Sequence, residues 1–411
     1  MLDKYLLRWI FLLVLIVFNL VIGLRTSIGV FYFLFWFLLS VSVLSLLWAA
    51  VTYLGSQLEL KRIVGDRVEE GDTLHLEMEV RNTGLFPVFN VVAADNLACA
   101  AGQERNKWIL VEFLGGKFTQ TYKYSCLCGR RGLYRIGPLA VYFFDPLGLF
   151  FFKRSLSRYD ELFVYPRTFP IEKFPTPLVK GTLPWFGIES KKFSGDEDEF
   201  YGIREYKEGD PIRRIHWLST ARKNKLIVKQ FQRQTFYRAT IVLSLEKENN
   251  FGQGKECVAE YMVRIAASVA KYLFERDISI ELIASAQKLV HLPSNKGREH
   301  LEDIFRFLAV ARAESELGLG EILEEFSRFT PDDSNLIVVM LDKDWEYLPI
   351  MLPLEKRNVS LVPLILASST FQYSFDQSGL VRDIKYKLSQ QYKINPMVIS
   401  RGDNLEEAFS R

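Results

Sequence analysis

Four cysteines carry the most reactive side chains of this chain: Cys99, Cys126, Cys128 and Cys257. Two of them form a Cys-x-Cys pair, a spacing that suits a metal or a redox couple. Residues i and i+2 of a strand share one face, however, so two small half-buried side chains explain the pair equally well. A nucleophilic thiol needs a base within hydrogen-bond reach, and no Cys-His-Asp pattern surrounds Cys126 or Cys257. A Cys-dependent hydrolase or transglutaminase-like enzyme is therefore an alternative only.

The remaining chemistry-bearing residues do not form a recognisable catalytic motif. The four histidines are His75, His216, His291 and His300, and none is paired at metal-ligand spacing. No nucleophile elbow, phosphate-binding loop, dinucleotide fingerprint or zinc-protease motif is present. The acidic run at residues 196–199 could attract a divalent cation, but a solvated loop explains it equally well. We therefore expect no enzyme and no cofactor.

A basic stretch at residues 202–233 is the most informative part of the chain, with nine Lys/Arg and three acidic residues. Asp210 predicts an N-cap and Pro211 the first position of a helix over about 211–222. This helix would align one stripe of side chains, formed by Ile212, Ile215 and Ser219. His216 lies in the same helix and is expected at a surface or an interface.

The basic stretch resembles the signature of the domain of unknown function 58 family of bacterial and archaeal membrane proteins. The matching positions are Arg204, Tyr206, Gly209-Asp210, Arg213, Ile215, Trp217 and Ala221-Arg222. Segments 130–138 and 145–150 resemble the same family, and the second is expected to be a turn in which Asp145 bonds its own backbone. No activity is established for the family, so the resemblance implies architecture and not chemistry.

The signature residues have two interpretations. Guanidinium groups bind carboxylates in a bidentate manner, so the arginines could dock a partner or lock two domains together. The lock would use acidic partners within the stretch, namely Glu205, Glu208 and Asp210. The residues assigned to this partner-binding or domain-locking site are Arg204, Tyr206, Asp210, Arg213, Arg214, Trp217 and Arg222.

The first 55 residues predict a transmembrane helical hairpin with spans at about 6–24 and 28–54. Each run has about the 20 apolar residues that cross a bilayer. A cleavable signal peptide is the competing interpretation of the first run, but no small-x-small cleavage site follows it. Basic residues flank the hairpin, whereas Arg25 is alone in the connecting loop. The positive-inside rule then predicts a multi-pass cell-membrane protein whose termini and soluble domains are cytoplasmic.

Residues 56–166 predict an all-β sandwich, because strand-like alternation recurs at short intervals without a helical period. Leu74, Leu76, Met78 and Val80 alternate with polar residues, and further candidates lie at 88–94, 108–114, 119–126 and 139–144. Residues 167–201 follow as a linker and an acidic loop.

Residues 202–411 contain the signature and then strands alternating with helices, which predicts an α/β domain with a mainly parallel sheet. Strands are expected at 239–245, 278–284, 336–341 and 359–366, and helices at 255–276, 300–313 and 348–356. The family resemblance implies a doubly wound von Willebrand factor A-like domain. The metal motif of such domains is degenerate here, because Ser244, Glu246 and Glu248 stand where Asp, Ser and Ser are expected. The small polar segment 370–411 is expected to cap this domain.

These features predict a membrane-anchored scaffold. Proteins of the resembled family are similar to partners of MoxR-type AAA+ ATPases, which implies such an ATPase and the lipid bilayer as partners. A structural envelope component is the further alternative. The net charge of +3 is too small to indicate nucleic-acid binding, and the sequence does not decide the oligomeric state.

Overall fold

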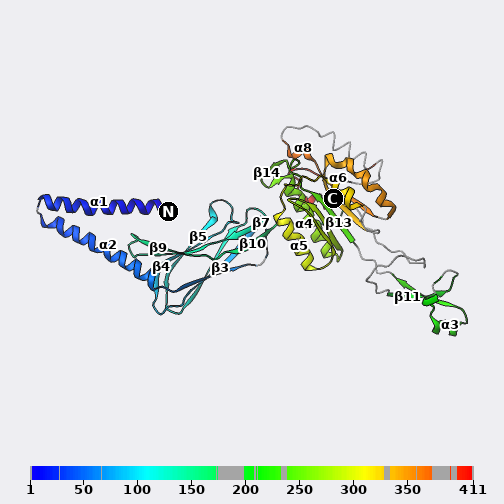
Figure 1. Cartoon of the computed structure of the whole chain (residues 1–411), viewed down its shortest axis with the longest axis horizontal. Coiled ribbons are helices and arrows are strands. Elements are labelled where there is room, and N and C mark those ends of the chain that lie inside the picture. Colours follow the sequence, from blue (N-terminus) through cyan, green and yellow to red (C-terminus); the bar gives the residue numbers. More distant parts are fainter. Residues whose placement is uncertain are drawn as a thin grey trace. The chain divides into compact units, whose positions relative to one another are not determined.

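The computed structural model describes residues 2–26, 28–65, 67–172, 174, 199–207, 210, 212–232, 238–327, 334–357, 359–372, 389 and 396–409. The chain divides into two compact units, Met1–Arg167 and Thr168–Arg411. Figure 1 shows the order of the elements along the chain.

Two apolar helices open the first unit, α1 (Leu2–Thr26) and α2 (Gly29–Gly55). Helix α2 is long and apolar enough to cross a membrane, with a mean hydropathy of 2.3 over a span that is only 6% buried. The apolar part of α1 that the structure describes, Ile10–Thr26, is shorter. An N-terminal helix suited to a membrane anchor is thus confirmed, whereas the second crossing and the cytoplasmic side stay predictions.

The Asp145 carboxylate joins α2 to the strands that follow it. It accepts backbone N–H bonds from Leu147 at 3.0 Å and Phe150 at 2.6 Å, which close the predicted turn. It also accepts a hydrogen bond from the Ser45 hydroxyl of α2. Asp145 is 2% exposed, so its acceptor capacity is used inside the unit and its role is structural.

Arg154 fastens the last turn of α2 to the same strands. Its guanidinium donates to the carbonyls of Ser56, at 2.9 Å, and Tyr53. A cation at a helix C-terminus also complements the helix dipole. The Tyr53 ring packs edge-on against Phe143 at 5.7 Å, which joins the helix end to the core.

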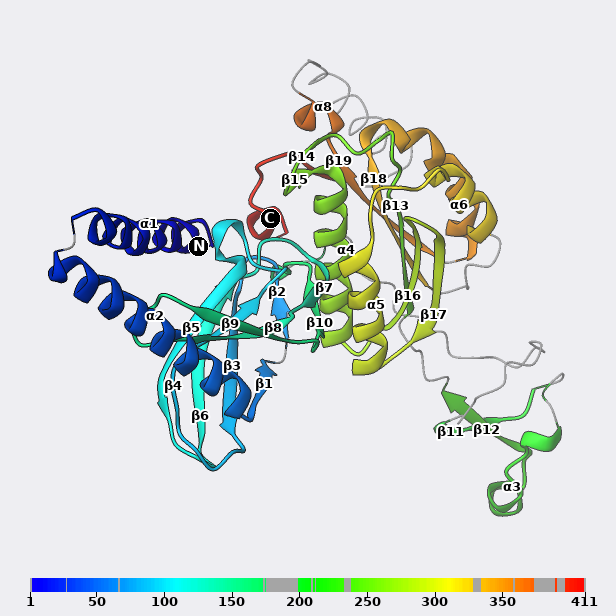
Figure 2. The ribbon, with the colours of Figure 1, turned by 60° about the vertical axis from the view of Figure 1, so that its left-hand side comes forward.

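Three sheets follow in the β-rich region of the first unit (Figure 2). Their strand orders are β1-β3-β6, β5-β4-β8-β9 and β2-β10-β7. The strands are β1 (Leu58–Val64), β2 (Val68–Glu69), β3 (Thr73–Asn82), β4 (Val88–Asn96), β5 (Asn106–Leu114), β6 (Thr119–Leu127), β7 (Gly132–Ile136), β8 (Leu139–Phe144), β9 (Phe151–Leu156) and β10 (Asp160–Tyr165), with a 3-10 turn η1 (Gly102–Arg105). The predicted β-rich region is confirmed, and the five strand candidates are present.

The first two sheets face each other across a shared apolar core. Inward side chains of β1 and β3 pack against those of β4, β5 and β8, and the cluster includes Leu60, Met78, Val91, Val111 and Val141. Folding removes these apolar side chains of both sheets from water. This burial is the main stabilising contribution when one sheet packs on another.

A buried charge lies at an inward position of β1. Arg62 donates to Asp95 of β4 at 2.8 Å, to Asp160 of β10 at 2.7 Å and to the Ile136 carbonyl of β7 at 3.3 Å. The Tyr124 hydroxyl donates to Asp95 at 2.5 Å. Burial first, and then the Asp95 carboxylate, raise the pKa of Tyr124, so the hydroxyl stays protonated and donates. One guanidinium thereby joins three strands to β1.

We expect Arg62→Met to destabilise the first unit by about 3–5 kcal/mol, because Asp95 would be left buried without its cation. Urea-dependent hydrogen exchange of β1 and β3 amides measures the loss. Lys61→Met on the exposed side of β1 is the matched control and should change little. The double variant R62M/D95N should recover part of the loss; if it is no more stable than R62M, the uncompensated charge is not the cause.

The second unit contains one six-stranded sheet with the order β17-β16-β13-β18-β19-β20. The strands are β13 (Arg238–Ser244), β16 (Ser279–Ser285), β17 (Leu289–Asn295), β18 (Asn335–Leu341), β19 (Ser360–Leu366) and β20 (Met397–Ile399), with a small hairpin of β14 (Gly252–Gln253) and β15 (Glu256–Cys257). All neighbouring pairs are parallel except β16 and β17. The predicted mainly parallel sheet is present, and β20 adds an edge strand from the C-terminal segment.

Helices cover both faces of this sheet (Figure 2). The helical segments are α4 (Val258–Glu275), α5 (Arg298–Val310), α6 (Leu319–Ser327), α7 (Leu348–Met351), α8 (Ser368–Phe371) and α10 (Leu405–Ala408), with 3-10 turns η3 (Asp342–Tyr347) and η4 (Leu352–Arg357). Ile322 and Leu323 of α6 pack on the face that presents Val242, Val338 and Met340. Helix α4 packs against β13, β16 and β18, and α5 packs against α4. The predicted helix at 348–356 was wrong in extent, since it divides into α7 and η4.

The start of the expected linker is packed and not extended. Phe169 contacts Phe409 at 5.2 Å, and Phe174 stacks on Tyr272 of α4 at 5.2 Å. Residues 175–198, which include the acidic residues 196–198, lie outside the described residues.

Candidate functional site

The family signature forms a small element built on an antiparallel strand pair, β11 (Glu199–Glu205) and β12 (Ile227–Gln232). Between the strands lie a 3-10 turn, η2 (Ile212–Arg214), and a short helix, α3 (Trp217–Lys223). Figure 1 labels β11 and α3. Asn224 ends α3 in the left-handed conformation, which lets the chain turn into β12.

The predicted helix over 211–222 was wrong in its first half, because the chain pairs with β12 before the helix begins. Ile215 forms an isolated bridge with Val228, and the His216 N–H donates to the Ile227 carbonyl at 2.8 Å. The helix therefore begins only at Trp217. His216 caps it, and its Nδ1 accepts the Ser219 N–H at 3.2 Å. The predicted stripe is divided as well, since Ile215 is buried and Ile212 is exposed.

Asp210 is not the N-cap, because its carboxylate binds Arg204. The guanidinium donates two hydrogen bonds of 2.6 Å, one to each carboxylate oxygen, and the Lys207 N–H adds a third bond at 2.9 Å. The hydrogen bonds from Arg204 lower the pKa of Asp210, although burial opposes the change. The pair thus stabilises the element above the ordinary carboxyl pKa and loses this effect as pH falls through the lowered value.

We expect Arg204→Lys to loosen the element by about 1–2 kcal/mol, because an ammonium cannot form the two parallel bonds. Faster hydrogen exchange of β11 and β12 amides is the measurement. The control is Lys225→Ala, which removes the ion pair with Glu205 in which both side chains are 67% exposed. Equal exchange in Arg204→Lys and wild-type protein would contradict a locking role.

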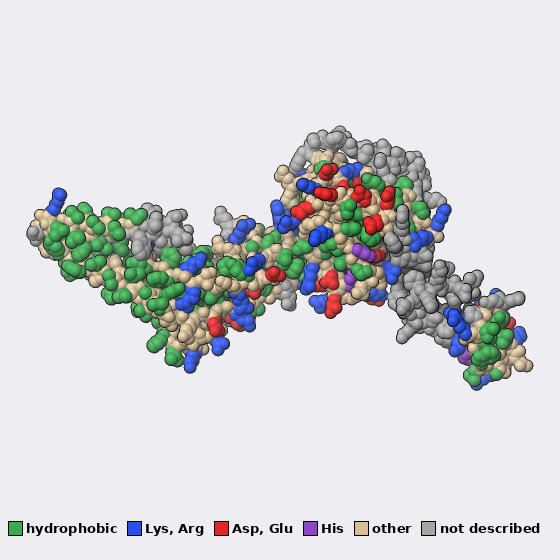
Figure 3. Space-filling model, in the orientation of Figure 1, with side chains coloured by type: hydrophobic (Ala, Val, Ile, Leu, Met, Phe, Trp, Pro, Cys, Tyr) green, Lys and Arg blue, Asp and Glu red, His purple; other side chains and the backbone are tan. Residues whose placement is uncertain are grey.

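An exposed apolar face occupies η2 and α3. Ile212, Trp217 and Leu218 are 69%, 63% and 65% exposed. The side chains of Arg213 and Arg222 are exposed beside them. Figure 3 shows hydrophobic and basic side chains gathered on this element. We call Ile212, Arg213, Trp217, Leu218 and Arg222 the signature face.

The structure therefore separates the predicted site into two groups. Arg204 and Asp210 form a lock within the element, whereas Arg213, Trp217 and Arg222 belong to the signature face. Tyr206 is half-buried and donates its backbone N–H to the Leu226 carbonyl at 2.8 Å, and Arg214 is half-buried. Sequence reasoning missed Leu218. The signal for it in the sequence was the adjacent pair Trp217-Leu218. These are the first two residues of the seven-residue helix α3, in which no residue is buried.

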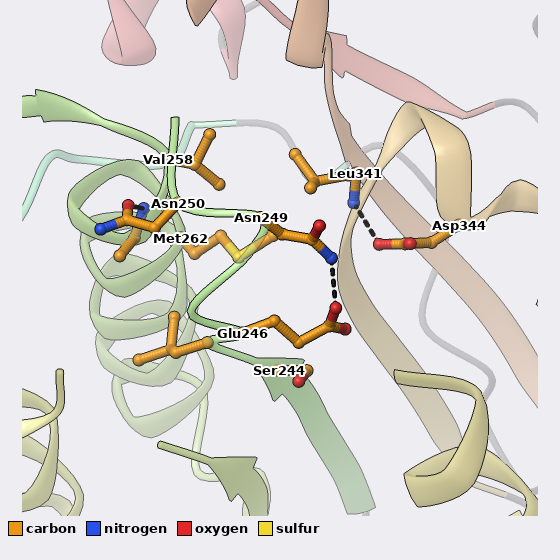
Figure 4. Close-up of a pocket in the computed structure, with 10 residues that line it drawn as sticks. Ser244, Glu246, Asn249, Asn250, Val258, Met262, Leu341 and Asp344 are labelled. Atoms are coloured by element: carbon orange, nitrogen blue, oxygen red, sulfur yellow. Dashed lines mark hydrogen bonds between the residues drawn. The ribbon is translucent and has the colours of Figure 1, made fainter. Parts of the chain in front are cut away.

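A second candidate site lies at the carboxyl ends of β13 and β18 (Figure 4). The strand β13 has β16, the next strand of the parallel sheet, on one side and β18 on the other, so the strand order changes direction at β13. In open α/β sheets such a switch point is where ligands bind. Ser244, Glu246, Asn249, Leu341 and Asp344 line the pocket.

Most polar groups of this pocket have partners from the chain. The Ser244 hydroxyl donates to the Leu317 carbonyl at 2.9 Å. Glu246 accepts from the Leu319 N–H at 3.1 Å and from the Asn249 amide. Glu248 is exposed. Among the described residues, the acidic groups here are not brought together as a set of three around one point.

Asp344 is the titratable group that this pocket perturbs most. It accepts the Leu341 N–H at 3.0 Å and is 7% exposed. Burial raises the pKa of Asp344 from 3.8 to about 6. The folded chain then holds a proton that the unfolded chain has lost, so stability falls as pH rises from about 3.8 to about 6.

We expect Asp344→Asn to stabilise the second unit at pH 8 by about 2–3 kcal/mol and to have little effect at pH 4. The amide oxygen keeps the bond from Leu341 and carries no charge at either pH. Urea-dependent hydrogen exchange of β18 at both pH values measures the difference, with the exposed Glu248→Gln as control. The same shift at both pH values would show that ionisation is not responsible.

The thiols considered for catalysis are buried. Cys126 is 1% exposed and Cys257, which precedes α4, is 8% exposed. His300 Nε2 lies 2.7 Å from the Ile280 carbonyl, and His291 Nε2 lies 2.7 Å from Glu281. Neither of these histidines is hydrogen-bonded to a thiol, so their observed contacts are structural.

Comparison with known proteins supports the class that the signature indicates. The family described as "Protein of unknown function DUF58" matches residues 202–352. The uncharacterized protein YeaD of Bacillus subtilis (strain 168) is 22% identical over 260 residues, which cover 61% of this chain and 61% of YeaD. The match thus spans less than two thirds of that relative's length. Both findings support the DUF58 family, whose function is unknown.

Similar solved structures do not assign a fold. The CARDB domain of PF1109 from Pyrococcus furiosus is 17% identical, covers 26% of this chain and 93% of that domain, and has a TM-score of 0.19. Proximal thread matrix protein 1 of the mussel byssus is 10% identical, covers 43% of this chain and 46% of its own, and has a TM-score of 0.28. Scores this low assign nothing to either unit.

Proposed function

We propose that this chain is a membrane-anchored docking protein that binds a MoxR-type AAA+ ATPase through its signature face. The observation that carries the proposal is the exposure of Ile212, Trp217 and Leu218 beside Arg213 and Arg222. Contiguous exposed apolar side chains are unusual on a soluble surface and mark interaction sites. Trp and Arg are also the residues that contribute most binding energy at protein interfaces.

The internal lock favours docking over a clamp between domains. Arg204 uses both arms of its guanidinium on Asp210, and Glu205 pairs with Lys225 at 3.1 Å. The acidic residues that a domain clamp would need are thus engaged within the element, as far as it is described. The face has basic side chains around an apolar centre, so its partner should present an acidic rim around an apolar pocket.

The second unit is proposed to be a von Willebrand factor A-like docking module. Its strand order, with parallel strands and one antiparallel edge strand β17, is consistent with this assignment. Helices on both faces of the sheet are consistent with double winding. The proposed topology is a helical hairpin, α1 and α2, with both soluble units at the cytoplasmic face.

The test is affinity capture of the detergent-solubilised full chain from its own host's membranes, with and without ATP. We expect an AAA+ ATPase to be recovered in a nucleotide-dependent way. The double variants W217A/L218A and R213E/R222E should each lower this recovery at least about tenfold, because each removes hot-spot residues.

Two matched controls keep the result specific. L85A/F86A removes an apolar pair that is 74% and 78% exposed in the first unit, and K288E/R312E reverses two exposed charges in the second. Both should capture the ATPase as wild-type protein does. Undiminished capture by folded W217A/L218A would sink the assignment of the face. If no ATPase is recovered under either condition, the proposed docking function is wrong.

A further inference from the structure

Three cysteine thiols meet in the core of the first unit. Cys126 lies on β6 and Cys128 one residue beyond its end, so both point to the same face. Cys99 comes from the turn that follows β4. The three sulfur atoms all lie within 4.8 Å of one another, and the residues are 1%, 0% and 2% exposed. Sequence reasoning found the pair but not Cys99, which is distant along the chain.

Backbone pairing holds the three cysteines in place. The Cys128 N–H donates to the Asp72 carbonyl at 2.9 Å, and the Gly129 N–H donates to the Cys99 carbonyl at 3.1 Å. Ala100 forms an antiparallel bridge with Cys128. The two segments that carry the thiols are therefore fixed side by side, and the sulfur atoms converge without depending on flexible side chains.

We propose that Cys99, Cys126 and Cys128 form a three-thiolate site for a soft d10 cation, and that this cation is Zn²⁺. Thiolate sulfur binds Zn²⁺ at about 2.3 Å, so three sulfurs around one ion lie about 3.8 Å apart. The observed sulfurs need to approach one another by no more than about 1 Å. Binding displaces three thiol protons to solvent and transfers no electrons.

Charge favours zinc over Cu⁺, the other common soft cation. A complex of three thiolates with a dication has a net charge of −1, whereas the complex with a monocation has a net charge of −2. The site lies among apolar side chains, including Leu74, Leu97 and Ile136, where the larger net charge is the more costly to bury. Zn²⁺ takes four ligands, which leaves one position for a small ligand from solvent.

The ion would fasten the turn after β4 to the end of β6. This role does not depend on the docking proposal, because the signature face belongs to the other unit. Success or failure of ATPase capture therefore leaves the metal site untouched, and the reverse holds as well.

The test is the metal content of the detergent-solubilised full chain, purified without chelator and measured by elemental mass spectrometry. We expect about one zinc per chain in wild-type protein and in Cys257→Ala, the matched control that changes the fourth cysteine. Cys99→Ala and Cys128→Ala should each lose at least about nine tenths of it. Chelator-stripped protein given Co²⁺ should show a thiolate-to-cobalt absorption band in wild-type protein and Cys257→Ala only.

A readout on wild-type protein covers the case in which a variant fails to fold. Zn²⁺ should slow alkylation of Cys99, Cys126 and Cys128, identified by peptide mass spectrometry, and leave Cys257 unchanged as the internal reference. Wild-type protein with four reduced thiols that holds no zinc and binds no added Co²⁺ or Zn²⁺ would overturn the proposal. Stoichiometric copper in place of zinc would overturn the choice of ion.

Discussion

The signature element depends on the ion pair between Arg204 and Asp210. A two-stranded element buries few apolar side chains, here Ile215, Ile227 and Val228, and such elements are marginal by themselves. Two charge-assisted bonds across the end of β11 supply the missing constraint. Because the lock consumes the carboxylate that would have capped a longer helix, the chain returns to β12 and leaves the signature face at the surface.

Buried charge follows the same rule in the two units, with different outcomes. Arg62 of the first unit has acidic partners on two strands, so it stays ionised and ties them together. Burial raises the pKa of Asp344 of the second unit to about 6. The hydrogen bond from the Leu341 N–H opposes this change, and the nearby Glu246 carboxylate adds to it. Removing one partner of a compensated buried pair is costly, whereas a poorly compensated buried charge limits stability at neutral pH.

The apolar helix α2 is joined to the β-rich region by several side-chain contacts. Ser45, Tyr53 and the end of the helix are fastened to β8, β9 and the turn between them through Asp145 and Arg154. The last turns of α2 therefore continue directly into the folded first unit. No flexible linker therefore separates the apolar helix α2 from the strands of the first unit.

Local patterns in the sequence determined the elements that bury one or both faces. Alternation predicted β3 to β6 and β8. Continuous apolar runs predicted the buried strands β13, β16, β18 and β19, and helical patterns predicted α4 and α5, because side-chain periodicity reports burial directly. Tertiary contacts decided what depends on residues remote in sequence. Asp210 prefers the Arg204 fork to a capping role, Ile215 joins β12, Arg62 occupies an inward position, and Cys99 completes the thiol cluster. Contacts between residues distant in sequence leave no periodic pattern along the chain. They are decided only in the folded chain, which brings these side chains within hydrogen-bond reach.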